Sequence, residues 1–123
     1  MKVLNMGTKK HTKIVIEDEP HPLNGANHEY AVIGANDPLG QDTSFARIIF
    51  QNGPVKEAGV NGCHHEDLLN IVLHRLEAFQ GGHGFYKCRE NAQAITKIEE
   101  ALHWLNYRTR KRESRGVEGT RAL

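Results

Sequence analysis

Residues 65–108 read HEDLLNIVLHRLEAFQGGHGFYKCRENAQAITKIEEALHWLNYR and carry the same apolar repeat twice. In each repeat, four large apolar residues follow at spacings of three, four and three positions, which places them on one face of a helix. They are Leu69, Val72, Leu76 and Phe79, and then Ile95, Ile98, Leu102 and Leu105. Gly81-Gly82 ends the first pattern. Residues 64–115 are therefore predicted to form a long antiparallel αα-hairpin.

Short β-branched segments before the hairpin predict a small antiparallel sheet within residues 12–55. The segments are TKIVIE (12–17), EYAVIGA (29–35) and SFARIIFQ (44–51), and turn-forming residues separate them. DPLG (37–40) matches a type I turn, with Asp first, Pro second and Gly fourth. Because strands precede helices instead of alternating with them, the predicted class is α+β, in a single domain 1–123. Residues 1–11 are predicted to be flexible, and residues 116–123 to form a tail.

The composition is that of an ordinary globular protein, with 38% hydrophobic and 25% charged residues among 123. No apolar run approaches the ~18 residues of a membrane span, so we expect no membrane partner. The opening MKVLNMGTKKHTK does not have the pattern of a secretory signal. The two cysteines, Cys63 and Cys88, do not make a disulfide framework and favour a reducing cytoplasm.

Positive charge is concentrated at the C-terminal end. Residues 1–107 contain 10 Lys and Arg against 13 Asp and Glu, a net of −3, whereas residues 108–123 contain 6 against 2, a net of +4. A binder of nucleic-acid polymers is normally basic overall, so this distribution favours a local anion site. Arg108, Arg112 and Arg115 share a face if the helix continues that far. Alternatively, these cations interact with the negative C-terminal end of the helix dipole. This explanation accounts poorly for Arg108, which lies about two turns before the last turn of the helix.

A second candidate group lies at the other tip of the hairpin, where Phe79 comes near Arg89 and Asn91. Core packing of Phe79 and a helix-capping role for Asn91 are the alternatives. Asn91 and Arg108 are separated by 17 residues of helix, or about 25 Å. A pocket that uses both groups would therefore need two chains. The second helix also has apolar surface to spare, so we expect a homo-oligomer built on a twofold dimer; the additional residues are Ala92, Ala94, Ala101 and Trp104.

Motifs for metal binding and catalysis are missing from the sequence. The eight histidines include the pair His64-His65 beside Cys63, but Cys-x-x-Cys and His-Glu-x-x-His do not occur. A glycine-rich phosphate loop followed by Lys-Ser/Thr and a Gly-x-Ser-x-Gly elbow do not occur either. We therefore expect no catalytic residues, no metal and no cofactor, and a protein that is not an enzyme.

Three segments together resemble a known phage family: FQNGPVKEAGVNG (50–62), LLNIVLHRLEAFQ (68–80) and CRENAQAITKIEEALHWLNYRTRKRESRGVEGT (88–120). The family consists of small proteins that block the bacterial Thoeris defence by sequestering its signal. They share a hairpin domain with phage sponges against the cyclic-oligonucleotide (CBASS) defence. The resemblance implies a sponge that binds cyclic ADP-ribose variants made by TIR-domain proteins, such as glycocyclic ADP-ribose, in the cytoplasm of the infected cell and leaves them uncleaved.

The resemblance also implies site residues and an assembly. It assigns ligand contacts to Phe79, Asn91 and Arg108, and more weakly to Arg112 and Arg115. It implies dimers, in some members hexamers of three dimers, and leaves cyclic di- and trinucleotides open as further ligands. The loop GGHGFYKC (81–88) looks longer than the family's usual connection. From the residues alone, a cyclic-nucleotide phosphodiesterase and a small nucleic-acid-binding accessory protein remain open as alternative functions.

Overall fold

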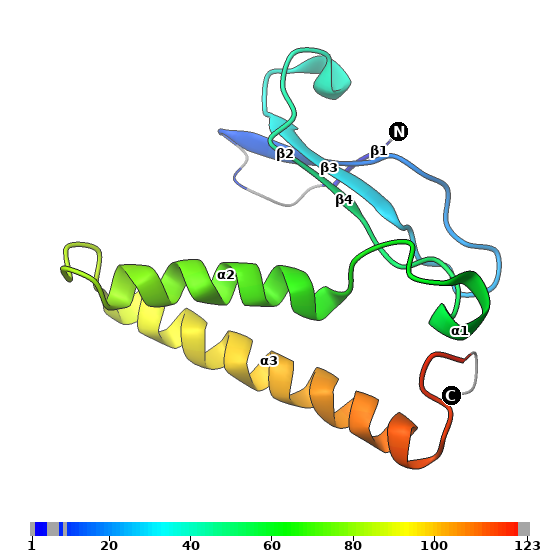
Figure 1. Ribbon diagram of the computed structural model, residues 1–123. Coiled ribbons are helices and arrows are strands. Elements are labelled where there is room, and N and C mark those ends of the chain that lie inside the picture. The colour runs from blue at the N-terminus through cyan, green and yellow to red at the C-terminus, as the bar shows by residue number, and fades with distance from the viewer. Residues whose placement is uncertain (1, 5–7, 9, 121–123) are drawn as a thin grey trace. The chain divides into compact units, whose positions relative to one another are not determined.

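The structure, a computed structural model, describes residues 2–4, 8 and 10–120. Its contacts divide the chain into two units, Met1–Asn52 with Val60–Cys63 and Gly53–Gly59 with His64–Leu123. The first unit holds a β-sheet and the short 3-10 helix η1 (Pro38–Gly40), and the second holds the α-helices (Figure 1). The predicted α+β class, with an N-terminal antiparallel sheet followed by a helical hairpin, is confirmed.

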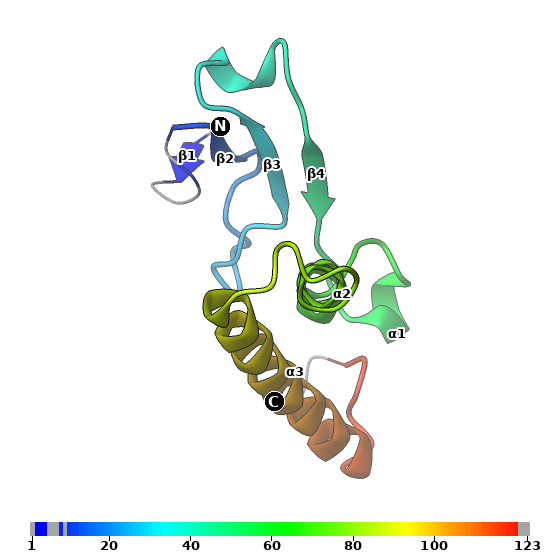
Figure 2. The same ribbon diagram turned by 90° about the vertical axis from the view of Figure 1, so that its left-hand side faces the viewer.

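The sheet has four antiparallel strands in the order of the sequence, β1-β2-β3-β4 (Figure 2). Strands β2 (Thr12–Ile16), β3 (Glu29–Gly34) and β4 (Ala46–Ile49) fall inside the three predicted segments. No strand was predicted within residues 1–11, but β1 (Lys2–Leu4) pairs with β2. A three-residue edge strand is held by its neighbour's hydrogen bonds and carries little apolar pattern of its own. Residues 1, 5–7 and 9 of the same segment lie outside the described residues.

One face of the sheet carries its apolar core. Val15, Ala31 and Ile33 form a buried cluster, and Val15 lies opposite Ala31 in the register of β2 and β3. Beyond β4, the chain closes on itself where Phe50 forms a bridge with Cys63. Gly62 is required there, because a Cβ would lie 2.4 Å from the carbonyl carbon of Phe50.

The turn after β3 is organised by a buried carboxylate. Asp37 accepts hydrogen bonds from the amides of Asp42 and Thr43 and from the Thr43 hydroxyl. The type I turn predicted for residues 37–40 is wrong, since Leu39 has φ 57° and ψ 30°, whereas that turn needs negative φ at its third residue. The backbone bends around the Asp37 carboxylate because a buried charge must be supplied with donors. The Thr43 hydroxyl bond is the largest of the effects that hold the pKa of Asp37 below its usual value.

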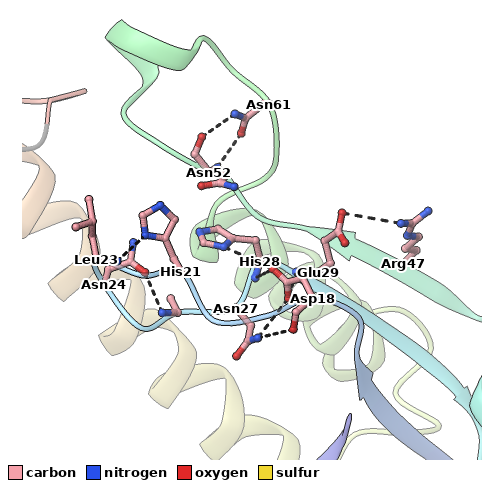
Figure 3. Close-up of polar contacts among 11 residues, drawn as sticks. Asp18, His21, Leu23, Asn24, Asn27, His28, Glu29, Arg47, Asn52 and Asn61 are labelled. Atoms are coloured by element: carbon pink, nitrogen blue, oxygen red, sulfur yellow. Dashed lines mark hydrogen bonds and ion pairs between the residues drawn. The ribbon is translucent and has the colours of Figure 1, made fainter. Parts of the chain in front are cut away.

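A second aspartate ties the loop between β2 and β3 to the start of β3. The Asp18 carboxylate accepts hydrogen bonds from the His28 and Glu29 amides and from the Asn27 side chain (Figure 3). Burial raises the pKa of Asp18, but these hydrogen bonds outweigh it and hold the pKa below its usual value. The His28 imidazole is buried, with its Nδ1 3.7 Å from the carboxylate, and contacts His21 edge-on.

The helical unit consists of α1 (Val55–Ala58), α2 (His65–Gln80) and α3 (Arg89–Ser114). Helices α2 and α3 lie side by side in both views and form the predicted hairpin (Figures 1 and 2). The predicted stripe of α3 is half-buried, but Val72 of α2 is 47% exposed and Leu73 is half-buried in its place. The short helix α1 was not predicted, because four residues carry no periodic signal.

Replacing Asp37 tests the carboxylate-centred turn. Because the folded pKa is lowered, ionised Asp37 stabilises the fold above its unfolded pKa, and this contribution is lost as the pH falls through the folded pKa. We expect Asp37→Asn to lower the free energy of unfolding at neutral pH. Below about pH 4, the free energy of unfolding of the variant should fall less with pH than that of the parent protein. Urea unfolding at about pH 7 and about pH 3 measures both effects. The control is Asp42→Asn, a neighbouring exposed acid; equal effects of the two variants would contradict the assignment.

Candidate functional site

The loop tip of the hairpin is an aromatic and cationic cluster. The Phe79 ring, half-buried at the end of α2, contacts the Tyr86 ring with a centroid distance of 5.4 Å. The guanidinium of Arg75, one helical turn earlier, lies 4.8 Å from the centre of the Phe79 ring. Sequence reasoning missed Arg75, although its position four residues before Phe79 is the spacing at which helical side chains meet.

The start of α3 is fastened to this tip by hydrogen bonds from both sides of the loop. The Cys88 amide donates to the side chain of Gln80, and the Cys88 sulfur accepts from the Asn91 amide at 3.4 Å, as an N-cap does. The Asn91 side chain donates to the Tyr86 carbonyl at 3.1 Å. Asn91 thus lies in the first turn of α3 with its side chain held by the loop, and Arg89 lies exposed at the first helical position.

At the other end of α3 the predicted arginine face divides into two kinds of residue. Arg108 and Arg115 are exposed, whereas Arg112 between them is 7% exposed. The Arg112 Nε donates to Glu118 at 3.1 Å, and a terminal nitrogen donates to the carbonyls of Val117 and Thr120. The sequence placed all three arginines on one face and did not indicate the burial of Arg112, because helical spacing says which residues share a face and not what covers them.

The segment after α3 folds back beside this end of the helix. The Val117 amide donates to the Arg112 carbonyl at 3.0 Å, and the Lys56 amide at the start of α1 donates to the Gly119 carbonyl at 3.1 Å. Gly119 has φ 81°, a conformation that favours glycine. Residues 117–120, called the tail clamp below, are therefore held by both α1 and α3.

The predicted site residues form two separate groups within one chain. Phe79, Arg89 and Asn91 belong to the loop tip, and Arg108, Arg112 and Arg115 belong to the far end of α3. The 17 residues from Asn91 to Arg108 correspond to about 25 Å of helix. A single hairpin does not bring the two groups around one small ligand.

Both helices expose large apolar side chains between these ends. Ile71 of α2 is 66% exposed and Trp104 of α3 is 65% exposed. The Trp104 ring contacts the Tyr107 ring edge-on, and the Lys111 ammonium lies 5.5 Å from the centre of the Tyr107 ring.

Three further features concern membrane helices, metal ligands and thiols. Within the described part of the chain, no helix is both long and apolar enough to cross a membrane. Among the same residues, no three His, Cys, Asp or Glu side chains are grouped as metal ligands. Cys63 and Cys88 are free thiols.

The fold defines a small α+β protein with an αα-hairpin, and the candidate side chains lie in two groups at the two ends of that hairpin. The family model described as the Acb2/Tad1 hairpin domain matches residues 42–110, more than half of the chain. A relative named Thoeris anti-defense 1, from Bacillus phage SBSphiJ7, is 42% identical over 130 residues, covering 90% of each chain. The chain therefore belongs to the Acb2/Tad1 hairpin family, and the resemblance to phage anti-Thoeris proteins is confirmed.

Replacing Cys88 tests the capping of α3. Serine is a preferred N-cap and its hydroxyl is a stronger acceptor than a thiol, whereas alanine offers no acceptor. We expect Cys88→Ser to be at least as stable as the parent protein and about 1 kcal/mol more stable than Cys88→Ala. Thermal unfolding of the three proteins measures the difference. Equal stability of the serine and alanine variants would show that the sulfur contact contributes nothing.

Proposed function

We propose that this protein is a phage anti-defence sponge that binds a cyclic ADP-ribose-type signal made by TIR-domain proteins and holds it without cleavage. The proposed signal is glycocyclic ADP-ribose. The proposed place of sequestration is the cytoplasm of the infected cell. The observation that carries the proposal is the likeness to a phage Thoeris anti-defence protein, 42% identical over 90% of both chains. The name of that relative states an anti-defence role and no ligand. The proposed binding without cleavage rests on the candidate site residues.

The chemistry of the two hairpin ends matches the two halves of such a ligand. A cyclic ADP-ribose has an adenine ring and a diphosphate. Stacking a base on an aromatic such as Phe79 contributes about 1–3 kcal/mol. A charge-assisted hydrogen bond from an arginine such as Arg108 contributes about 1.5–3 kcal/mol. Nanomolar affinity needs about −12 kcal/mol net, so several contacts in a water-poor cleft are required.

The separation of the two ends favours a site shared by two chains. Two hairpins packed antiparallel would bring the Phe79 and Asn91 end of one chain to the arginine end of the other. The exposed apolar residues of both helices support such packing; they are Ile71, Val72, Trp104 and Tyr107. The proposed assembly is therefore a homodimer. A hexamer of three dimers and the binding of cyclic di- or trinucleotides are extensions of the same proposal, and they follow from the family resemblance.

A binding and release experiment tests the function. Purified protein is incubated with glycocyclic ADP-ribose, freed of excess ligand, and heated to release what it holds. We expect the intact nucleotide to be recovered in a fixed ratio to protein, as measured by chromatography and mass spectrometry. A hydrolysed product would favour a phosphodiesterase. A failure to retain the nucleotide, with salt-sensitive binding to RNA or DNA instead, would favour the nucleic-acid alternative.

Mixed dimers test whether the site is shared. We expect Phe79→Leu to weaken binding by about tenfold or more, because it removes the stacking surface. Arg108→Gln should weaken binding by removing a cation. A mixture of the two variants should regain about a quarter of the sites, because half of randomly formed dimers are heterodimers with one intact pair.

The control for this experiment mixes either variant with the Phe79→Leu/Arg108→Gln double variant, a combination in which no intact pair can form. Titration of the mixtures with glycocyclic ADP-ribose counts the sites. A mixture of the single variants that binds no better than these controls would assign both residues to a site within one chain.

A further inference from the structure

The guanidinium of Arg112 is buried near the C-terminal end of α3, among side chains that are exposed. Arg112 is the only buried residue of α3, whose whole length is described. Its neighbours on the same face, Arg108 one turn before and Arg115 about one turn after, are exposed. A buried charge is retained only where paired and hydrogen-bonded, so Arg112 must be satisfied from within the protein.

Three acceptors of the Arg112 guanidinium belong to the tail clamp. Its Nε lies 3.1 Å from the Glu118 carboxylate, and a terminal nitrogen lies 3.1 Å and 2.9 Å from the carbonyl oxygens of Val117 and Thr120. The guanidinium donates from separate nitrogens of one fixed plane, here Nε and a terminal nitrogen, whereas the donors of an ammonium all lie on a single atom. The side chain of Arg112 therefore bonds to three of these four residues and, together with the backbone contacts of the segment, holds them in place.

The lengths of the two helices explain why this end needs a clamp. Helix α3 has 26 residues and α2 has 16. Because the loop joins them at one tip, α3 extends about ten residues, or ~15 Å, past the start of α2. Its inward stripe continues through half-buried Thr109 to Arg112, and the tail clamp supplies the partners of Arg112 there.

We propose that Arg112 is a positioning residue: it does not contact the ligand, but holds residues 117–120 as a preformed wall of the anion site whose cations are Arg108 and Arg115. This inference rests on the proposed function. Glu118 compensates the charge of Arg112, so the attraction for an anion comes from the exposed arginines. The wall adds affinity because no segment has to be ordered when the ligand binds.

Removing Glu118 separates this role from direct contact, because the two predict opposite signs. If Arg112 contacted the anion, Glu118→Ala would release its charge and raise affinity. If Arg112 positions the wall, Glu118→Ala loosens the wall, and we expect about tenfold weaker binding. Glu118→Gln keeps an acceptor oxygen and should lose less. The matched control Glu113→Ala removes the same charge from an exposed position nearby and should leave both wall and affinity intact.

Arg112→Lys tests the geometry of the side chain, because it keeps the positive charge and removes the planar arrangement of guanidinium donors. We expect it to behave like Glu118→Ala, whereas a direct charge role predicts nearly unchanged affinity. Two measurements are made on each variant: amide hydrogen exchange of residues 116–120 without nucleotide, and calorimetric titration with glycocyclic ADP-ribose. Circular dichroism melts show whether each variant is folded.

Faster exchange in residues 116–120 together with weaker binding, in Glu118→Ala and Arg112→Lys and not in Glu113→Ala, is the expected result. Unchanged or tighter binding by Glu118→Ala would overturn the inference, even if the segment exchanged faster. Failure of the parent protein to bind the nucleotide would refute the proposed function and, with it, the ligand-related part of this inference. The exchange measurements would still decide whether Arg112 orders the tail clamp.

Discussion

The packing of α2 against α3 is the interaction on which the arrangement of the candidate site depends. The half-buried stripe of α3 runs through Ile95, Ile98, Leu102 and Leu105 with alternating spacings of three and four. Such a stripe keeps one face of a helix against a partner along its length. It holds the helices antiparallel, so Phe79 at the end of α2 and Asn91 at the start of α3 lie at the same tip, and the C-terminal arginines lie at the opposite end.

The two ends of the hairpin are built on different physical principles. At the loop tip, neutral hydrogen bonds and ring contacts order a short connection, and the Tyr86 carbonyl and the Cys88 sulfur both receive donors from Asn91. At the far end, an ion pair and two carbonyl bonds order the tail clamp around Arg112. Contacts within the chain therefore order both ends, and in the proposed function this order lowers the entropic cost of holding a small ligand.

The sheet unit shows how side chains override local sequence signals. DPLG matched a common turn, yet the Asp37 carboxylate collects donors from residues 42 and 43 and draws the backbone into a different path. Strand β1 carries a weak pattern of its own, and its pairing with β2 exists because Ile14–Ile16 present an open ladder. Local sequence patterns predict neither the path of the turn at residues 37–40 nor the strand β1, since each depends on hydrogen-bond partners several residues away.

The sequence by itself determined the α+β class, three of the four strands, both long helices and the tip that Phe79 and Asn91 share, because apolar periodicity and glycine punctuation are local properties. Its signature segments also identified the family. Only the tertiary structure decided that Val72 points away from the inward stripe, that Arg75 lies over Phe79, and that Arg112 is buried while Arg108 and Arg115 are not. Periodicity assigns residues to faces, whereas burial depends on what the rest of the chain lays against each face, and here a tail of four residues distinguishes one arginine from its neighbours.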